Sequence, residues 1–206
     1  MNFILSSPSV EELVRLLRAW RFWVLGAIVG ALLGTVIYYV ALPPYRAQAT
    51  VNVDFNLEQA LSDATDRQQF YYLEREARKL EEIAWSDDLM ATLSSEFAIS
   101  VEELREKKLH LSQPADAGWH FYADDHNPQI AEGLASAWAN AFVEKVQAEI
   151  AVGNANEFIK IEVTQSANLP KERRIPLANY LLSGSFGFLT LAIFVLLFTK
   201  PKTVSK

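Results

Sequence analysis

Two long apolar segments enclose a polar middle. The first, Phe22 to Leu42, has 21 residues without a charge, and the second, Ile175 to Thr199, has 25. At about 1.5 Å per helical residue, each is long enough to cross a hydrocarbon layer of about 30 Å. The pattern predicts two transmembrane helices, 22–42 and 175–199, around a water-soluble domain, 43–174.

The middle domain mixes strand and helix periodicities. Apolar side chains recur at every second position in 47–55 and again in 158–165, as in half-buried strands. In chain order the predicted elements are a strand at 47–55, helices at 66–84 and 86–97, strands at 109–113 and 119–123, a helix at 128–153 and a strand at 158–165. This order predicts a small α+β domain, a mixed sheet with helices on one face.

Two helices carry specific expectations. Asn127 followed by Pro128 is a typical helix start, because asparagine caps the first free N–H groups and proline fits the first helical position. In the 66–84 helix, Glu74 and Arg78 are expected to pair on the solvent side. Its buried stripe is expected to consist of Phe70, Leu73, Ala77, Leu80 and Ala84.

Charge sets the expected orientation. The ends of the chain, a predicted amphipathic helix at 1–21 and a tail at 200–206, each carry three Lys or Arg residues close to a predicted span. The positive-inside rule therefore places both termini in the cytoplasm and 43–174 outside. That domain holds 23 acidic and 13 basic residues, a balance that argues against nucleic acid as a partner. Signal-peptide cleavage near Ala47–Ala49 is the alternative, but the apolar run exceeds the usual 7–15 residues or so.

Small residues mark the predicted spans. Gly26, Gly30 and Gly34 recur every four residues and place bare backbone on one helix face, where another helix can approach. Gly184 and Gly187 do the same in the second span. We predict that these glycines pack helices within the chain, within an oligomer or against a membrane partner. Glycine is also common in membrane helices without such a role.

Prolines mark both junctions between the spans and the domain. The first has Pro43, Pro44, Tyr45 and Arg46 leading into the first strand. The second has Pro170 and Pro176 on either side of the basic residues Lys171, Arg173 and Arg174. Because proline disfavours helix at the residue before it, each junction separates span from strand.

The chain resembles the Wzz family of polysaccharide co-polymerases, the chain-length determinants of surface polysaccharides. The resemblance lies in three places, in the family's order along nearly the whole chain. They are the Gly-rich span followed by Leu-Pro-Pro-Tyr-Arg-Ala-Gln-Ala-Thr-Val (42–51), the Asp125–Pro128 start of an Ala-rich helix, and Val-x-Gln-x-Ala-x-Leu-Pro (163–170) with Pro176 before the second Gly-containing span.

The resemblance implies a non-enzymatic protein of the inner membrane that forms homo-oligomers. It would regulate the length, polymerisation or export of lipopolysaccharide O-antigen or exopolysaccharide. The implied partners are a membrane polysaccharide polymerase and the growing polysaccharide. In tall family members the corresponding helix extends far from the membrane, whereas the helix that starts at 128 is expected to end near Gly153. An alternative is an adaptor that activates a separate cytoplasmic tyrosine kinase through residues 200–206, and a further one is a sensor or scaffold.

Catalytic and cofactor chemistry has little support in the sequence, and we expect no catalytic residue, cofactor or metal. No phosphate-binding glycine loop occurs, and no Ser, His and Asp are aligned as a triad. Asp124, Asp125 and His126 are candidate metal ligands, but a polar turn before the Asn127 cap explains them better. Trp119, Phe121 and Tyr122 are candidates for stacking on sugars, with core packing as the favoured role.

Overall fold

A computed structural model describes residues 10, 14, 17–60, 65–113 and 118–198. Contacts within the chain divide it into two compact units. One consists of residues 1–43 and 175–206, and the other, here called the α+β unit, consists of residues 44–174. The division falls between Pro43 and Pro44 and between Arg174 and Ile175, at the proline-marked junctions.

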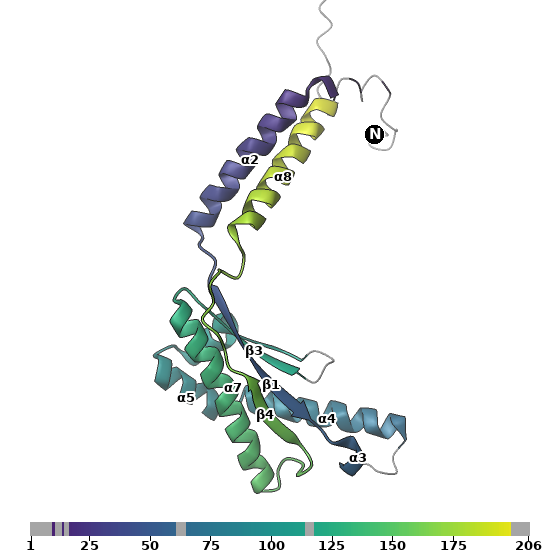
Figure 1. Ribbon diagram of the computed structural model, residues 1–206, viewed down its shortest axis with the longest axis vertical. Helices are drawn as coiled ribbons and strands as arrows, with labels where there is room; N and C mark the ends of the chain where they lie inside the picture. The colour runs from purple at the N-terminus through teal and green to yellow at the C-terminus, as the bar shows by residue number, and fades with distance from the viewer. Residues whose placement is uncertain (1–9, 11–13, 15–16, 61–64, 114–117, 199–206) are drawn as a thin grey trace, which may run out of the picture. The chain divides into compact units, whose positions relative to one another are not determined.

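The first unit contains two helices, here called the helix pair. Helix α2 covers Trp20–Val40 and α8 covers Leu177–Phe198, and the two pack against each other (Figure 1). Both are long and apolar enough to cross a membrane, judged by length and composition. Relative to the predicted helix 22–42, α2 begins and ends two residues earlier, and its end precedes the two prolines, which disfavour helix. Thr199 and most of the predicted helix at 1–21 lie outside the described residues.

The α+β unit is built on a four-stranded antiparallel sheet in the order β2-β3-β1-β4. Its strands are β1 (Tyr45–Asp54), β2 (Leu109–Ser112), β3 (Gly118–Asp125) and β4 (Lys160–Gln165). The prediction of a mixed sheet is wrong, since every neighbouring pair is antiparallel. Strands β1 and β2 do run in the same direction, but β3 lies between them, and therefore no parallel pair forms.

Helix α7 (Pro128–Ala151) packs on the sheet against β1, β3 and β4 (Figure 1). Helices α4 (Asp66–Ala84) and α5 (Asp87–Phe97) pack against α7 in turn. The remaining short helices are α3 (Leu57–Ala60), α6 (Val101–Glu103) and a π-helical turn at Leu104–Lys108. This arrangement leaves the alternate, polar residues of the strands on the other face of the sheet.

The core forms where the sheet meets α7. Apolar residues at alternate positions of β1, from Ala47 to Val53, are buried, as the strand pattern predicts. They meet Phe121 of β3 and Trp138 of α7, which pack edge to face with ring centroids 4.8 Å apart. The indole N–H of Trp138 donates to the carbonyl oxygen of Ala84 at 2.9 Å and thereby ties α7 to the end of α4.

The ends of α7 form as its sequence predicts. The side chain of Asn127 accepts a hydrogen bond from the backbone N–H of Gln129 at 2.9 Å, and Pro128 occupies the first turn. After Ala151 the chain turns at Gly153, whose φ of 80° is accessible to glycine without strain. The predicted helix end near Gly153 is therefore confirmed.

The buried stripe of α4 differs from the prediction. Leu80 and Ala84 are buried, but Phe70 is 62% exposed, and Tyr72 and Glu76 take the expected place of apolar residues. The stripe is a strict four-residue repeat that begins at Tyr72 and includes a carboxylate. Glu76 is tolerated there because Arg75 Nε and Lys79 Nζ lie 2.9 and 3.3 Å from its Oε1 atom.

Ala98 ends α5 in the left-handed region, with φ of 55° and ψ of 37°. A Cβ atom crowds the backbone in this conformation, whereas glycine adopts it freely. We expect Ala98→Gly to raise the free energy of unfolding by about 0.5–1 kcal/mol. Chemical unfolding of the full chain in detergent, followed by near-ultraviolet circular dichroism, measures the change. A destabilised variant contradicts the prediction.

Candidate functional site: a buried aspartate at the strand ends

Asp124 lies near the end of β3, directly opposite Arg46 of β1. Its side chain is only 3% exposed. Arg46 donates two parallel hydrogen bonds to it, Nε to Oδ1 and Nη2 to Oδ2, each at 2.7 Å. The guanidinium of Arg46 also lies over the ring of Tyr122, 5.2 Å from its centroid. This bidentate, stacked geometry is specific to arginine, and lysine does not reproduce it.

Two further groups converge on the same carboxylate. Arg174 Nη1 donates to Asp124 Oδ2 at 3.0 Å, and His110 Nε2 lies 3.3 Å from the same oxygen. Arg46 comes from the first strand, His110 from β2, and Arg174 from the last residues before α8. Asp124 therefore joins three segments that are far apart in the sequence, and we call these four residues the Asp124 cluster.

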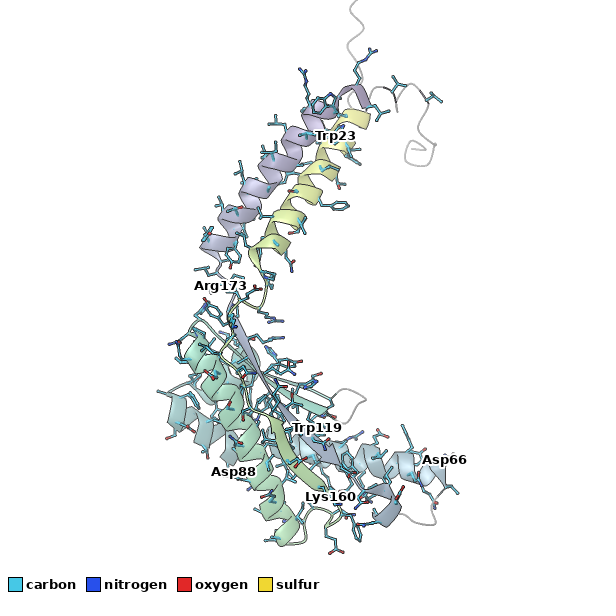
Figure 2. The ribbon with its side chains drawn as sticks, viewed as in Figure 1. Trp23, Asp66, Asp88, Trp119, Lys160 and Arg173 are labelled. Carbon is cyan, nitrogen blue, oxygen red and sulfur yellow. The ribbon has the colours of Figure 1, made fainter. Side chains whose placement is uncertain are left out.

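The two ends of the α+β unit meet beside this cluster. The backbone N–H of Arg174 donates to the carbonyl oxygen of Pro44 at 2.9 Å, and Tyr45 forms an isolated antiparallel bridge with Arg173. Arg173, labelled in Figure 2, places its guanidinium 4.5 Å from the centroid of the Tyr45 ring. The chain therefore leaves the unit at the point where it enters.

A second carboxylate beside Asp124 is paired separately. Asp125 Oδ2 accepts a hydrogen bond from Lys108 Nζ at 2.6 Å, and Oδ1 accepts one from the backbone N–H of Asn127 at 2.7 Å. Burial opposes the charge of Lys108, but Asp125 and Glu103 outweigh it and raise the pKa of Lys108. Burial likewise opposes the charge of Asp125, but the hydrogen bonds from Lys108 and Asn127 outweigh it and lower the pKa of Asp125.

We expect the Lys108–Asp125 pair to stabilise the α+β unit between about pH 4 and pH 10. The pKa of Asp125 is depressed, so its contribution is present above its unfolded pKa of about 3.9 and is lost as the pH falls through the folded pKa. The pKa of Lys108 is raised, so its contribution is present below about 10.4 and is lost as the pH rises through the folded pKa.

Melting temperatures of the wild-type chain and of Asp125→Asn across this pH range provide the measurement. The difference between the two proteins should be largest inside the window and should shrink at both ends. A difference that stays constant with pH contradicts the assignment.

The glycines predicted to pack helices lie mostly inside the helix pair. A Cβ atom built on Gly30 meets the carbonyl oxygen of Gly184 at 2.2 Å, and one on Gly34 meets that of Tyr180 at 2.3 Å. One on Gly26 lies 3.0 Å from the Cβ atom of Ala192. A Cβ atom on Gly187 meets nothing within 4 Å. The face with Gly26, Gly30 and Gly34 is therefore occupied by α8 of the same chain.

The predicted junction residues have unequal roles. Pro44 and Tyr45 contact Arg174 and Arg173, which precede α8, whereas Arg46 shares the carboxylate of Asp124 with Arg174. The carbonyl oxygen of Pro176 accepts a hydrogen bond from the backbone N–H of Asn179 at 3.0 Å, in the first turn of α8. Pro170 lies in the irregular segment between β4 and α8, and Pro43 lies just after α2.

The other candidates from the sequence are distributed differently. Asp124 and Asp125 point to separate cations, and no group of three or more His, Cys, Asp or Glu residues in the described part of the chain could hold a metal ion. Trp119 and Phe121 are buried in the core, whereas Tyr122 lies on the other face of β3. Sequence reasoning missed the Asp124 cluster, although Arg46 on the polar side of a strand was a usable signal.

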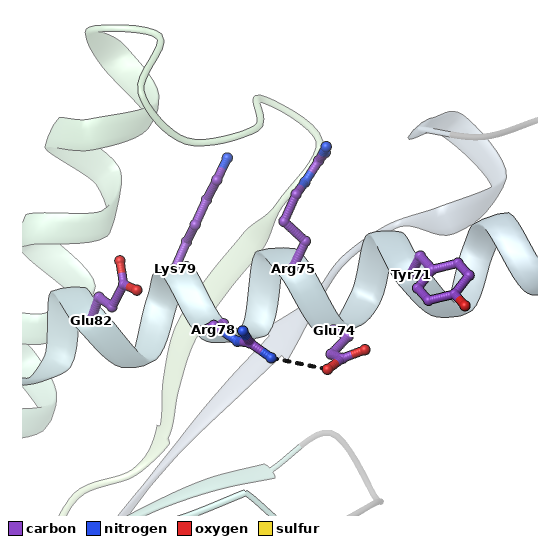
Figure 3. A pocket seen from close by; sticks show the side chains of 6 residues that line it. All are labelled: Tyr71, Glu74, Arg75, Arg78, Lys79 and Glu82. Carbon is purple, nitrogen blue, oxygen red and sulfur yellow. Dashed lines mark hydrogen bonds and ion pairs between the residues drawn. The ribbon is translucent and has the colours of Figure 1, made fainter.

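The outer surface of α4 carries a shallow depression of about 460 Å³. Figure 3 shows its lining, which comes from α4 alone and includes Tyr71, Arg75 and Lys79. Across it Arg78 Nη2 donates to Glu74 Oε1 at 3.0 Å, which confirms the predicted pair on the solvent side. Because no second element contributes, we assign no site here.

No protein-family model matches this sequence, and no curated protein is significantly similar to it.

Proposed function

We propose that this chain is an oligomeric co-polymerase of the inner membrane. It regulates the chain length, polymerisation or export of a surface polysaccharide, such as lipopolysaccharide O-antigen or an exopolysaccharide. Helices α2 and α8 cross the membrane, both termini are cytoplasmic, and the α+β unit stands on the outer side. The protein acts on a membrane polysaccharide polymerase and has no active site of its own.

The Asp124 cluster is the observation that carries the proposal. The family resemblance lies in three separate segments, and each contributes to this cluster or adjoins it. The first segment supplies Arg46, the second begins at Asp125 beside Asp124, and the third runs on to Arg174. Because the three motifs meet at or beside one cluster, their order along the chain has a structural explanation. Short motifs that lay far apart in the fold would give the resemblance less support.

The cluster suggests how the α+β unit is coupled to the membrane. Both of its connections to the helix pair are fixed at one place by Asp124 and by the Pro44–Arg174 hydrogen bond. A displacement of either of these ends of the α+β unit is therefore resisted by the sheet. The face with Gly26, Gly30 and Gly34 is occupied within the pair, so a polymerase would contact the remaining, lipid-exposed side chains of α2 and α8.

A deletion strain tests the proposal. We expect its surface polysaccharide to change in length distribution or amount, as resolved by gel electrophoresis, and to be restored by the wild-type chain. Glu74→Ala, which removes only an exposed ion pair, should restore it equally well. An unchanged polysaccharide in the deletion strain overturns the proposed function.

A further inference from the structure

The sheet of the α+β unit ends in two edges, β2 and β4. Among the described residues, neither edge strand pairs with a second strand. Figure 2 labels Lys160, at the start of β4. An edge strand presents a row of backbone donors and acceptors that another strand can bind.

The two edges run in opposite directions. Each of the three strand pairs is antiparallel, so the direction reverses three times between β2 and β4. If a second copy is placed beside the first in the same orientation, its β4 therefore lies antiparallel to β2 of the first. This head-to-tail arrangement keeps the two copies in the same orientation, which their insertion in one membrane allows.

The side chains of the two edges match in one register. Val163 opposite Leu109, and Ile161 opposite Leu111, extend the apolar side of the sheet. Glu162 then lies opposite His110, and Lys160 opposite Ser112, on the polar side. In this register each of the four residues of β2 lies opposite one of residues 160–163. Any other register that keeps the apolar sides together leaves some residues of β2 without a partner in 160–163.

The backbone groups of the two edges match in the same register. Outside the irregularity at Thr50 and Val51, odd-numbered residues lie opposite odd-numbered ones and even-numbered opposite even-numbered ones in all three strand pairs. In antiparallel pairing successive residues direct their backbone groups to alternate sides. The residues whose backbone groups point away from the sheet are therefore either odd-numbered in both β2 and β4 or even-numbered in both. The proposed register places odd residues opposite odd ones and even opposite even, so these backbone groups face each other.

Residues 160–163 also lack the features that block edge pairing. They include no proline and no bulge, and their two charges, Lys160 and Glu162, are opposite in sign. Both charged side chains lie on the polar side of the strand, while Ile161 and Val163 on the other side are half-buried. A neighbouring strand would complete the burial of these two residues.

We propose that β4 of one copy pairs with β2 of the next, so that a single antiparallel sheet continues from copy to copy. This inference rests on the oligomeric state in the proposed function and specifies its contact. Four residue pairs bury too little surface for a stable complex in dilute solution. Confinement of the helix pairs to one membrane raises the effective concentration and aligns the edges. A head-to-tail contact closes into a ring when its rotation angle allows.

Disulfide cross-linking of the full chain in membranes tests the contact, because the sequence has no cysteine. Ser112→Cys combined with Lys160→Cys places two thiols directly opposite each other between copies, at a distance that a disulfide spans. Both residues are exposed, so folding should tolerate the changes. Ser112→Cys with Thr164→Cys is the matched control, because Thr164 is also exposed but lies four residues, about 13 Å, further along the strand.

The first pair should give a ladder of dimers, trimers and larger species after mild oxidation, at least tenfold more than the control pair. Co-expression of two tagged chains, one with each single cysteine, should give mixed dimers only. Dimers of either single variant with itself, or no ladder from the first pair, overturn the edge contact. Native mass measurement in mild detergent and the deletion phenotype are separate readouts, so an intact oligomer without cross-links leaves the proposed function standing.

Discussion

Replacing Asp124 by alanine is expected to lower the free energy of unfolding of the α+β unit by about 3 kcal/mol. The carboxylate is 3% exposed and accepts charge-assisted hydrogen bonds from Arg46 and Arg174. Its removal leaves two guanidiniums without their acceptor. The side chains of Arg46 and Arg174 are 25% and 44% exposed and can bind water instead. The loss of free energy of unfolding should therefore lie at the low end of the range for breaking a fully buried ion pair, about 3–5 kcal/mol.

Urea unfolding of the full chain in detergent, followed by the near-ultraviolet signal of the core tryptophans, measures this change. Glu74→Ala is the matched control, because it removes an exposed ion pair with Arg78 and should cost about 0.5 kcal/mol or less. In the deletion strain, the Asp124→Ala chain should also restore the polysaccharide less well than Glu74→Ala. Equal stability of the two variants would show that Asp124 does not hold the strand ends together.

Replacing Gly30 by leucine is expected to separate the helix pair. The Cβ atom alone would lie 2.2 Å from the carbonyl oxygen of Gly184, and no side-chain rotation relieves a clash with backbone. The helices must move apart, at a cost of about 3 kcal/mol. Spin labels on cysteines at Leu32 and Leu182, both exposed, report the distance between the helices in lipid.

Gly187→Leu provides the control on α8, because a Cβ atom there meets nothing within 4 Å. We expect its spin-label distance to equal that of the parent chain, whereas Gly30→Leu should shift the distance by several ångström and broaden it. An unchanged distance in Gly30→Leu means that the pair does not pack through its glycines in lipid.

Local patterns predicted the elements well, because each depends on a few neighbouring residues. Asn127 with Pro128 located the start of α7. The alternation along the first strand correctly predicted its buried residues Ala47, Ala49, Val51 and Val53. The bounds Asp66–Ala84 of α4 match the prediction, although its buried stripe does not. Phe70 is apolar yet exposed, and Glu76 is charged yet buried, because the position of a side chain on the helix overrides its polarity.

The sequence did not predict which distant segments of the chain pair with each other. The strand order depends on β3 lying between β1 and β2, and no single segment records that choice. The partners of Asp124 lie 78, 14 and 50 residues away along the chain, so that only the folded sheet brings them together. The same limit applied to the glycines, whose spacing predicted a packing face but did not identify α8 as its partner.

The hydrogen bond between Arg174 and Pro44 also bears on how such a chain can be rebuilt. A domain whose first and last residues are neighbours behaves as an insertion in its host, and chains tolerate exchange at such sites. The α+β unit is therefore a cassette within a helical hairpin. A two- or three-residue turn in place of residues 45–173 should still allow α2 and α8 to pair, and a foreign domain with adjacent termini should be displayed from the same hairpin.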